Sequence, residues 1–252
     1  MTDSVNKTFV MSRTLVLVYG VLSYFIGVAG LLCIIATLAK LMPFGFLNAS
    51  PTALPILWNV VLIALWGLIH TLMARDQFKS LITKFIPNAA ERPTYVLLAG
   101  ITSILLVGLW QHVPGIVWGI ANPTVVIALW SLFVFGWVYL LASTFAINHF
   151  DLFGLRQVYL NFKNQPEPPL AFTKRAMYKF TRHPIQTGVL IGVWAIPTMT
   201  VTHIILSLGF TIYIFIGLWF EEKDLLKDIG EPYAEYRLET GKVLPKLFGR
   251  EG

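Results

Sequence analysis

Four long apolar runs constrain this chain more than any other feature of its sequence. They occupy residues 15–39, 54–74, 94–111 and 124–147, and each provides the ~20 residues that a helix needs to cross a bilayer. Hydrophobic residues make up 56% of the chain and charged residues 13%, whereas soluble domains average about 45–50% and 25%. These observations predict an all-α, polytopic integral membrane protein.

A fifth apolar stretch, residues 185–220, is too long for one comfortable crossing. Pro197 divides it into a short first half and a full second half, because proline disrupts a helix interior. We interpret the stretch as a tight hairpin of two helices that turns near 197–203. The expected total is therefore six crossings.

Basic residues alternate between the connections as this topology requires. They lie before the first run, between the second and third, and after the fourth and the hairpin, whereas the connections near 42–53, 112–123 and 198–202 contain no Lys or Arg. Only Lys40 falls on the uncharged side. The positive-inside rule then predicts cytoplasmic N- and C-termini. The net charge of +6 suits anionic lipid and requires no nucleic-acid partner.

One membrane domain, residues 1–252, is expected, with its polar mass in two cytoplasmic segments, 147–184 and 221–252. The first segment predicts an interfacial helix that ends before "QPEPP". In the second, Gly230 suits the end of one helix and Pro232 the start of another.

The first apolar run is too long for a signal-peptide core and lacks a small-x-small cleavage site, so it is expected to remain as a span. Cys33 is the only cysteine and lies within that run. It cannot form an internal disulfide or a cysteine-based metal site, and packing is its expected role.

The stretch "TRHPIQTG" precedes a new apolar segment. Pro184 suits the first position of a helix, which makes His183 the expected N-cap and leaves backbone N–H groups for an anion. Arg182 adds a fixed positive charge. Gly188 either permits close approach of a ligand or serves helix packing through "GVLIG". A structural flank and a binding site are both compatible with this pattern.

Glu221 and Glu222 follow "GLWF" at the other end of the predicted hairpin, which brings them near Arg182 and His183. Two carboxylates at a helix C-terminus oppose the helix dipole. This predicts a compensating cation or a hydroxyl-rich ligand, the alternative being a solvated helix end.

"RHPIQTG", followed after a hydrophobic hairpin by "EEKDLLKDIGEPYAEYR", resembles the isoprenylcysteine carboxyl methyltransferase superfamily of membrane enzymes. Within that superfamily, "HTLMAR" and "HFDLFGLRQ" are similar to the bacterial methanethiol S-methyltransferase family. This similarity covers about residues 13–247. Gln186 stands where the superfamily often has an aromatic residue, which disfavours an isoprenyl-type substrate.

The resemblance implies transfer of a methyl group from S-adenosylmethionine to methanethiol, giving dimethyl sulfide, in a bacterial cytoplasmic membrane and without a metal. The basic helix start suits the carboxylate of S-adenosylmethionine. The two glutamates suit its ribose hydroxyls or its ammonium group, and three tyrosines suit its adenine. The implied cofactor residues are Tyr178, Arg182, His183, Pro184, Gly188, Glu221, Glu222, Tyr233 and Tyr236.

The thiol proton requires an acceptor, because only the thiolate is an effective nucleophile and a cysteine-like thiol has a pKa near 8.5. His70 and His149 are the candidate bases, since both are predicted at the cytoplasmic ends of their spans. Asp151 is placed to orient an imidazole and Arg156 to clamp the site. The alternatives are a helix-packing hydrogen bond for His70 and a loop cap for His149 with Asp151.

Two other functions stay open from the sequence. The first is methyl transfer to another acceptor, such as a prenylcysteine carboxylate, a lipid amine or another thiol. The second is a non-catalytic transporter or assembly factor, although no charge is predicted near the bilayer midplane, where a translocation site would need one. The sequence leaves the oligomeric state undetermined.

Overall fold

The computed structural model describes residues 12–47, 52–168 and 174–246. Almost all of its regular structure is helical. The long helices are α1 (Arg13–Leu38), α2 (Pro55–Met73), α4 (Glu91–Gly108), α5 (Pro123–Ile147) and α9 (Val201–Ile229). The shorter elements are α3 (Asp76–Ile82), η1 (Asn88–Ala90), β1 (Ile116–Gly119), α6 (His149–Leu152), α7 (Leu155–Phe162), η2 (Ala176–Lys179), α8 (Pro184–Trp194), β2 (Thr198–Thr200) and α10 (Glu231–Glu239).

Within these described ranges, five helices are long and apolar enough to cross a membrane: α1, α2, α4 with η1, α5 and α9. They confirm a helical, polytopic membrane protein. The predicted hairpin also forms, since α8 and α9 pack together on either side of β2. However, α8 has only 11 residues, or ~16 Å of helix. It is therefore shorter than a complete crossing.

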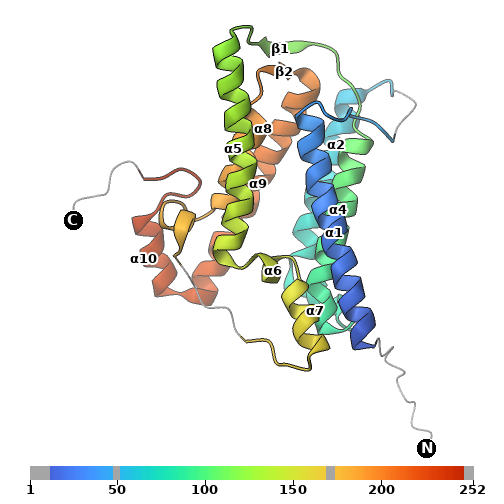
Figure 1. Cartoon of the computed structure of the whole chain (residues 1–252), viewed down its shortest axis with the longest axis vertical. Helices are drawn as coiled ribbons and strands as arrows, with labels where there is room; N and C mark the ends of the chain where they lie inside the picture. The colour runs from blue at the N-terminus through green and yellow to red at the C-terminus, as the bar shows by residue number, and fades with distance from the viewer. Residues whose placement is uncertain (1–11, 48–51, 169–173, 247–252) are drawn as a thin grey trace, which may run out of the picture.

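The helices form two groups that stand side by side (Figure 1). One group contains α1, α2 and α4, and the other contains α5, α8 and α9. Within the groups, α1 packs closely along α4 and α5 along α8, while α2 contacts α9 and joins the two. The described start of α1 and the helix α10 lie at the same end of the bundle.

Glycines set how closely these helices approach. A Cβ atom on Gly30 of α1 would lie 2.5 Å from the carbonyl oxygen of Gly100 on α4. A Cβ on Gly188 of α8 would lie 2.6 Å from the carbonyl oxygen of Gly136 on α5. Any side chain at these positions would therefore push the backbones apart. The structure thus places Gly188 in helix packing, one of the two roles its sequence pattern predicts.

Two short strands at the upper end differ from the all-α expectation. β1 and β2 pair antiparallel, with Ile116 opposite Thr200 and Gly119 opposite Thr198. The ribbon joins the turn of the α8–α9 hairpin to the connection before α5 (Figure 1). Both strands are too short to give a readable alternation in the sequence.

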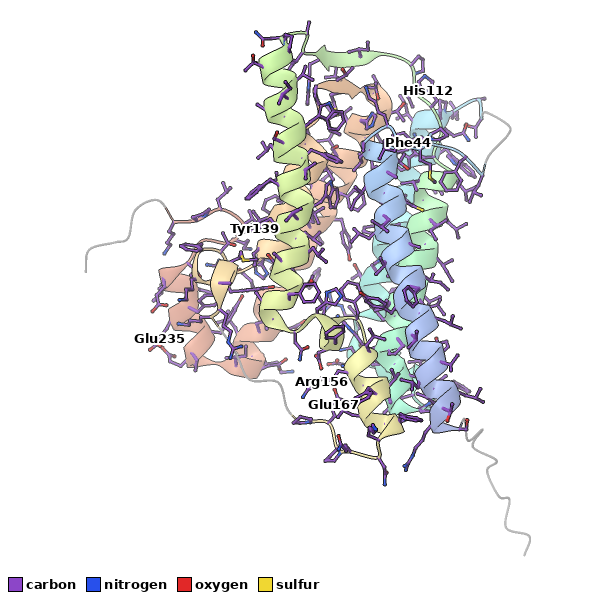
Figure 2. The ribbon with its side chains drawn as sticks, viewed as in Figure 1. Phe44, His112, Tyr139, Arg156, Glu167 and Glu235 are labelled. Atoms are coloured by element: carbon purple, nitrogen blue, oxygen red, sulfur yellow. The ribbon has the colours of Figure 1, made fainter. Side chains whose placement is uncertain are left out.

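At the opposite, lower end lie Arg156, which is on α7, and Glu167, which follows that helix, whereas His112 lies at the upper end (Figure 2). The predicted interfacial helix exists as α7, but it packs against α1 through Val158, which is completely buried. Gly230, with φ of 74°, ends α9 as expected, and Pro232 lies in the first turn of α10.

One prediction about the hairpin is wrong. Glu221 and Glu222 do not end a helix, because α9 continues without a break to Ile229. The carboxylates therefore lie two turns inside the helix, where the C-terminal dipole does not oppose them.

Candidate active site

A polar cavity of about 510 Å³ opens at the lower end between α2, α4, α8 and α9. Its volume lies within the range of about 300–1,000 Å³ typical of small-molecule sites. Its polar wall residues include acidic and basic side chains, one imidazole and one amide. They are His70, Arg75, Lys79, Arg92, Gln186, Glu221, Asp224 and Asp228.

An apolar cavity of about 380 Å³ adjoins it deeper in the bundle, between the two helix groups. Its walls include Trp66, Trp137 and Phe210. The two cavities have several wall residues in common: Arg92, Tyr95, Gln186, Tyr213 and Ile214. The polar cavity and the apolar cavity therefore share one boundary.

The α9 wall of the polar cavity follows helical spacing. Tyr213, Gly217 and Glu221 recur every four residues and share one face. Asp224 continues this face toward the lower end. Glu222, one residue further on, is displaced by about a quarter turn and does not line the cavity. The two adjacent glutamates consequently have different surroundings.

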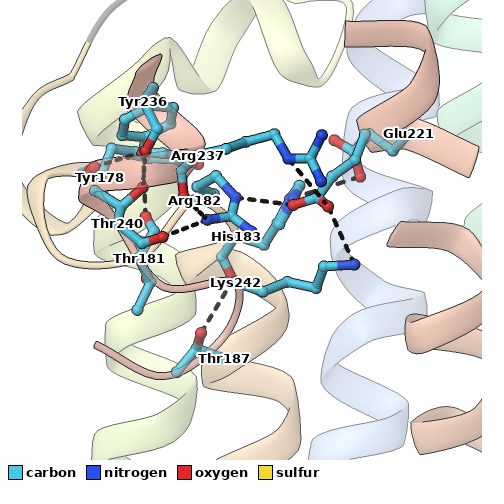
Figure 3. Close-up of polar contacts among 11 residues, drawn as sticks. Tyr178, Thr181, Arg182, His183, Thr187, Glu221, Tyr236, Arg237, Thr240 and Lys242 are labelled. Carbon is cyan, nitrogen blue, oxygen red and sulfur yellow. Dashed lines mark hydrogen bonds and ion pairs between the residues drawn. The ribbon is translucent and has the colours of Figure 1, made fainter. Parts of the chain in front are cut away.

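The buried Glu222 is the centre of an ion cluster, and its partners Arg182, His183 and Lys242 are labelled in Figure 3. Its Oε1 accepts a hydrogen bond from Arg182 Nε at 2.8 Å and lies 3.3 Å from His183 Nε2. Its Oε2 lies 3.1 Å from Lys242 Nζ and 3.9 Å from Arg237 Nε. The predicted pairing of this acid with the start of α8 is present, and the protein itself supplies the compensating cations.

The segment after α10 closes over the start of α8. Arg182 N–H donates to the carbonyl of Gly241 at 2.9 Å, and His183 N–H donates to that of Lys242 at 3.1 Å. The guanidinium of Arg182 also donates to the carbonyls of Arg237 and Thr240. Arg182 is thus occupied by contacts within the protein.

His183 is the N-cap of α8, as predicted, and Pro184 occupies the first turn. Burial lowers the pKa of His183 to about 4, although the nearby Glu222 carboxylate acts in the opposite direction. The imidazole is therefore neutral at physiological pH. Its Nδ1 lies 3.8 Å from the Glu221 carboxylate, which remains half exposed.

Tyr178, Tyr233 and Tyr236 are buried between η2 and α10, and none of them lines the polar or the apolar cavity. The hydroxyl of Tyr236 donates to the carbonyls of Tyr178 and Thr181. Burial raises the pKa of all three phenols, to about 12 for Tyr236. These side chains are therefore protonated and hold α10 against the chain that leads into α8.

His70 has an imidazole suited to accept a proton. Its Nδ1 lies 2.8 Å from the carbonyl oxygen of Trp66, which can only accept, so Nδ1 carries the hydrogen. In the neutral ring the lone pair then resides on Nε2. The residue is buried yet lines the polar cavity.

His149 is occupied on both ring nitrogens. Thr144 Oγ1 donates to the carbonyl of Leu141 and can therefore accept from His149 Nδ1, 2.8 Å away. The hydroxyl of Tyr24 then donates to Nε2 at 3.0 Å. Burial lowers the pKa of His149, and Phe145 stacks on the ring at 4.2 Å.

Asp151 pairs with Arg156 at 3.1 Å and accepts from Gln157 at 3.3 Å. In the described part of the chain no hydrogen bond joins Asp151 to the His149 ring. The structure therefore supports the loop interpretation of this pair more than the imidazole-orienting one.

Several cavity residues were not identified as site residues from the sequence. Arg75 and Asp224 lie inside the quoted motifs "HTLMAR" and "EEKDLL", and their guanidinium and carboxylate are 3.5 Å apart. From the sequence, Gln186 is only a departure from a family pattern. Four-residue spacing along α9 could have grouped Glu221 with Tyr213, but only if the helix was known to continue.

Fold and site together define a helical membrane protein whose polar cavity and ion cluster lie at one end of the bundle. Methanethiol S-methyltransferase of Mycobacterium tuberculosis is 39% identical to it over 238 residues, or 93% of this chain and 98% of the relative. The enzyme of the same name from Crocosphaera subtropica is 40% identical over 93% of each chain. The chain belongs to the methanethiol S-methyltransferase family and is a methyltransferase.

A more distant similarity connects the chain with Nurim of Sus scrofa, which is 26% identical over 68% of each chain. No family model matches the chain. No solved structure matches it either.

Proposed function

We propose that this protein transfers a methyl group from S-adenosylmethionine to methanethiol, giving dimethyl sulfide. The supporting observation is the polar cavity that shares a wall with an apolar one. A charged nucleoside and a small oily thiol differ greatly in polarity, and these two compartments suit one each.

The polar cavity fits S-adenosylmethionine by volume and by its donor set. Glu221 and Asp224 suit the ribose hydroxyls or the ammonium, and Arg75 suits the carboxylate. When bound, S-adenosylmethionine supplies a methyl group already activated on a sulfonium, so no metal is required. Glu222, Arg182 and His183 act as the frame that holds α8 beside Glu221.

In this proposal methanethiol occupies the apolar cavity, with its sulfur at the shared wall. His70 Nε2 takes the thiol proton. The thiolate sulfur then forms the new S–C bond as the bond between the methyl carbon and the sulfonium breaks. The products are dimethyl sulfide and S-adenosylhomocysteine, and the proton on His70 passes to water.

We propose six crossings, with α8 and its flanking residues making the short one, in the cytoplasmic membrane of a bacterium. Both termini and the polar cavity then face the cytoplasm, where S-adenosylmethionine is available. The concentration of basic residues at the lower end supports this orientation.

The test combines turnover with binding. Detergent-purified protein is supplied with S-adenosylmethionine and methanethiol, and headspace dimethyl sulfide is measured by gas chromatography. Calorimetry gives the Kd of S-adenosylmethionine separately. Glu221→Gln is expected to raise that Kd, because it removes the negative charge of a cavity carboxylate. The folded fraction should stay unchanged.

Each other outcome has a distinct meaning. Binding without dimethyl sulfide would exclude methanethiol and favour another thiol, a lipid amine or a prenylcysteine carboxylate. Failure to bind S-adenosylmethionine in folded protein would favour a non-catalytic membrane protein.

A further inference from the structure

Arg92, in the first turn of α4, borders three cavities at once. It lines the polar cavity, the apolar cavity and a third one of about 400 Å³ beside Asp151 and Glu91. The first two meet at this residue. Arg92 is therefore a fixed positive charge at the entrance to the apolar cavity.

Two contacts hold the Arg92 side chain in place. Its Nε donates to the carbonyl of Leu152 at 2.7 Å, and its guanidinium carbon lies 5.0 Å from the centre of the Tyr95 ring. Leu152 and Tyr95 themselves line the apolar cavity. The guanidinium is thus held in place by the hydrogen bond of its Nε and by the contact of its planar face with the Tyr95 ring.

The charge of Arg92 has no close carboxylate partner. In the described part of the chain, no Asp or Glu oxygen lies within 4.0 Å of its guanidinium, and its Nη groups donate to no described atom. By contrast, Arg182 and Arg156 have carboxylates at 2.8 Å and 3.1 Å. A guanidinium at an apolar wall without a counter-ion favours binding of an anion.

We propose that Arg92 holds the methyl acceptor as its thiolate at the boundary between the two cavities. This inference rests on the proposed thiol methylation. An alkyl thiol is mostly protonated at neutral pH, and a fixed positive charge next to sulfur favours the anion. His70 accepts the proton, and the Nη groups of Arg92 contact the sulfur that remains.

Other titratable and charged side chains around this boundary also influence the protonation of a bound thiol. On the polar-cavity side they are His70, Arg75, Lys79, Glu221, Asp224 and Asp228. On the third cavity's side they are Glu91, Asp151 and Glu167. Of these residues, none lines the apolar cavity, so Arg92 is the charged side chain that the thiol meets there.

The experiment compares Arg92→Gln and Arg92→Lys with wild type, using the whole protein in detergent. We expect Arg92→Gln to lower kcat/KM for methanethiol about 10²-fold at neutral pH. Its activity should rise further into the alkaline range than that of wild type, and its Kd for S-adenosylmethionine should not change. Arg92→Lys, which keeps the charge, should recover part of the activity.

A second substrate separates anion stabilisation from simple packing. 2,2,2-Trifluoroethanethiol is more acidic than ethanethiol and has the same carbon skeleton, so Arg92→Gln should impair its methylation less than that of ethanethiol. Equal losses for both thiols with an unchanged pH profile would overturn the inference. A weakened Kd for S-adenosylmethionine would instead assign Arg92 to the cofactor. Failure of wild type to form dimethyl sulfide would refute the proposed function itself.

Discussion

At the scale of single residues, the neighbours of each ring nitrogen distinguish the two candidate bases. His70 gives its Nδ1 hydrogen to a backbone carbonyl and lines the polar cavity. His149 contacts a threonine and a tyrosine through its two nitrogens. The sequence predicted both at similar depth, and it could not reveal the contact of His149 with Tyr24, which is distant in the chain.

His70→Gln should reduce turnover by about 10²–10⁴, the usual contribution of a positioned general base. Binding of S-adenosylmethionine should persist, because glutamine keeps a polar side chain in the cavity wall and binding involves no proton transfer. Headspace dimethyl sulfide and calorimetry measure the two effects. His149→Gln is the control and should mainly lower the Tm; loss of turnover there with full activity in His70→Gln would reverse the assignment.

His183 should make stability depend on pH. Its pKa in the folded protein, about 4, lies below the ordinary value of about 6.5, so the unfolded chain binds more protons between these values. Stability should therefore fall as pH is lowered from about 6.5 to about 4. Thermal unfolding of wild type and His183→Gln across this pH window measures the dependence of Tm on pH. Tm should change less with pH in the variant than in wild type. An identical dependence in both proteins would contradict the prediction.

At the scale of elements, the Glu222 cluster joins α8, α9 and the segment after α10. The sequence motif predicted that these charges meet, because a hairpin brings its two ends together. It did not predict which glutamate faces the cavity. The run "EEKD" resembles the end of a helix, whereas α9 extends well beyond it.

Glu222→Gln should destabilise the protein by about 3–5 kcal/mol, because it leaves the buried guanidinium of Arg182 without its counter-ion. The Tm in detergent measures this loss. Glu221→Gln is the matched control at the neighbouring position and should leave the Tm almost unchanged, since that carboxylate is half exposed. Equal effects on Tm would show that the two glutamates share one environment.

Gly188→Ala tests helix packing against a direct contact with the cofactor. Its added Cβ would meet the backbone of α5, which should cost about 1–3 kcal/mol and leave the Kd of S-adenosylmethionine unchanged in the folded fraction. Gly217→Ala, with no atom within 4 Å of its added Cβ, is the stability control. A weakened Kd at full stability would instead favour the predicted cofactor role of Gly188.

At the scale of the whole molecule, the apolar runs predicted the long helices well, because crossing a bilayer requires about 20 apolar residues whatever the packing. The cavities were not predictable, since their walls come from helices that are distant in the chain. Gln186 and Tyr95, for example, line the same cavities only because the two helix groups pack together.

Membrane orientation can be checked with single cysteines in a Cys33→Ala background. Lys163→Cys, at the end of α7, should react with an impermeant maleimide only in inverted vesicles. Lys40→Cys, after α1, should react in intact cells, because the two exposed positions lie at opposite ends of the bundle. Labelling of both from the same side would refute the proposed orientation.

The wall shared by the polar and apolar cavities has a consequence for release. Under the proposed reaction, one product is a nucleoside that dissolves in water and the other is a volatile thioether that dissolves in hydrocarbon. The surrounding lipid then acts as a sink for the thioether, while the nucleoside diffuses into the cytosol. The two products can therefore be released independently, and the thioether needs no exporter to leave the cell.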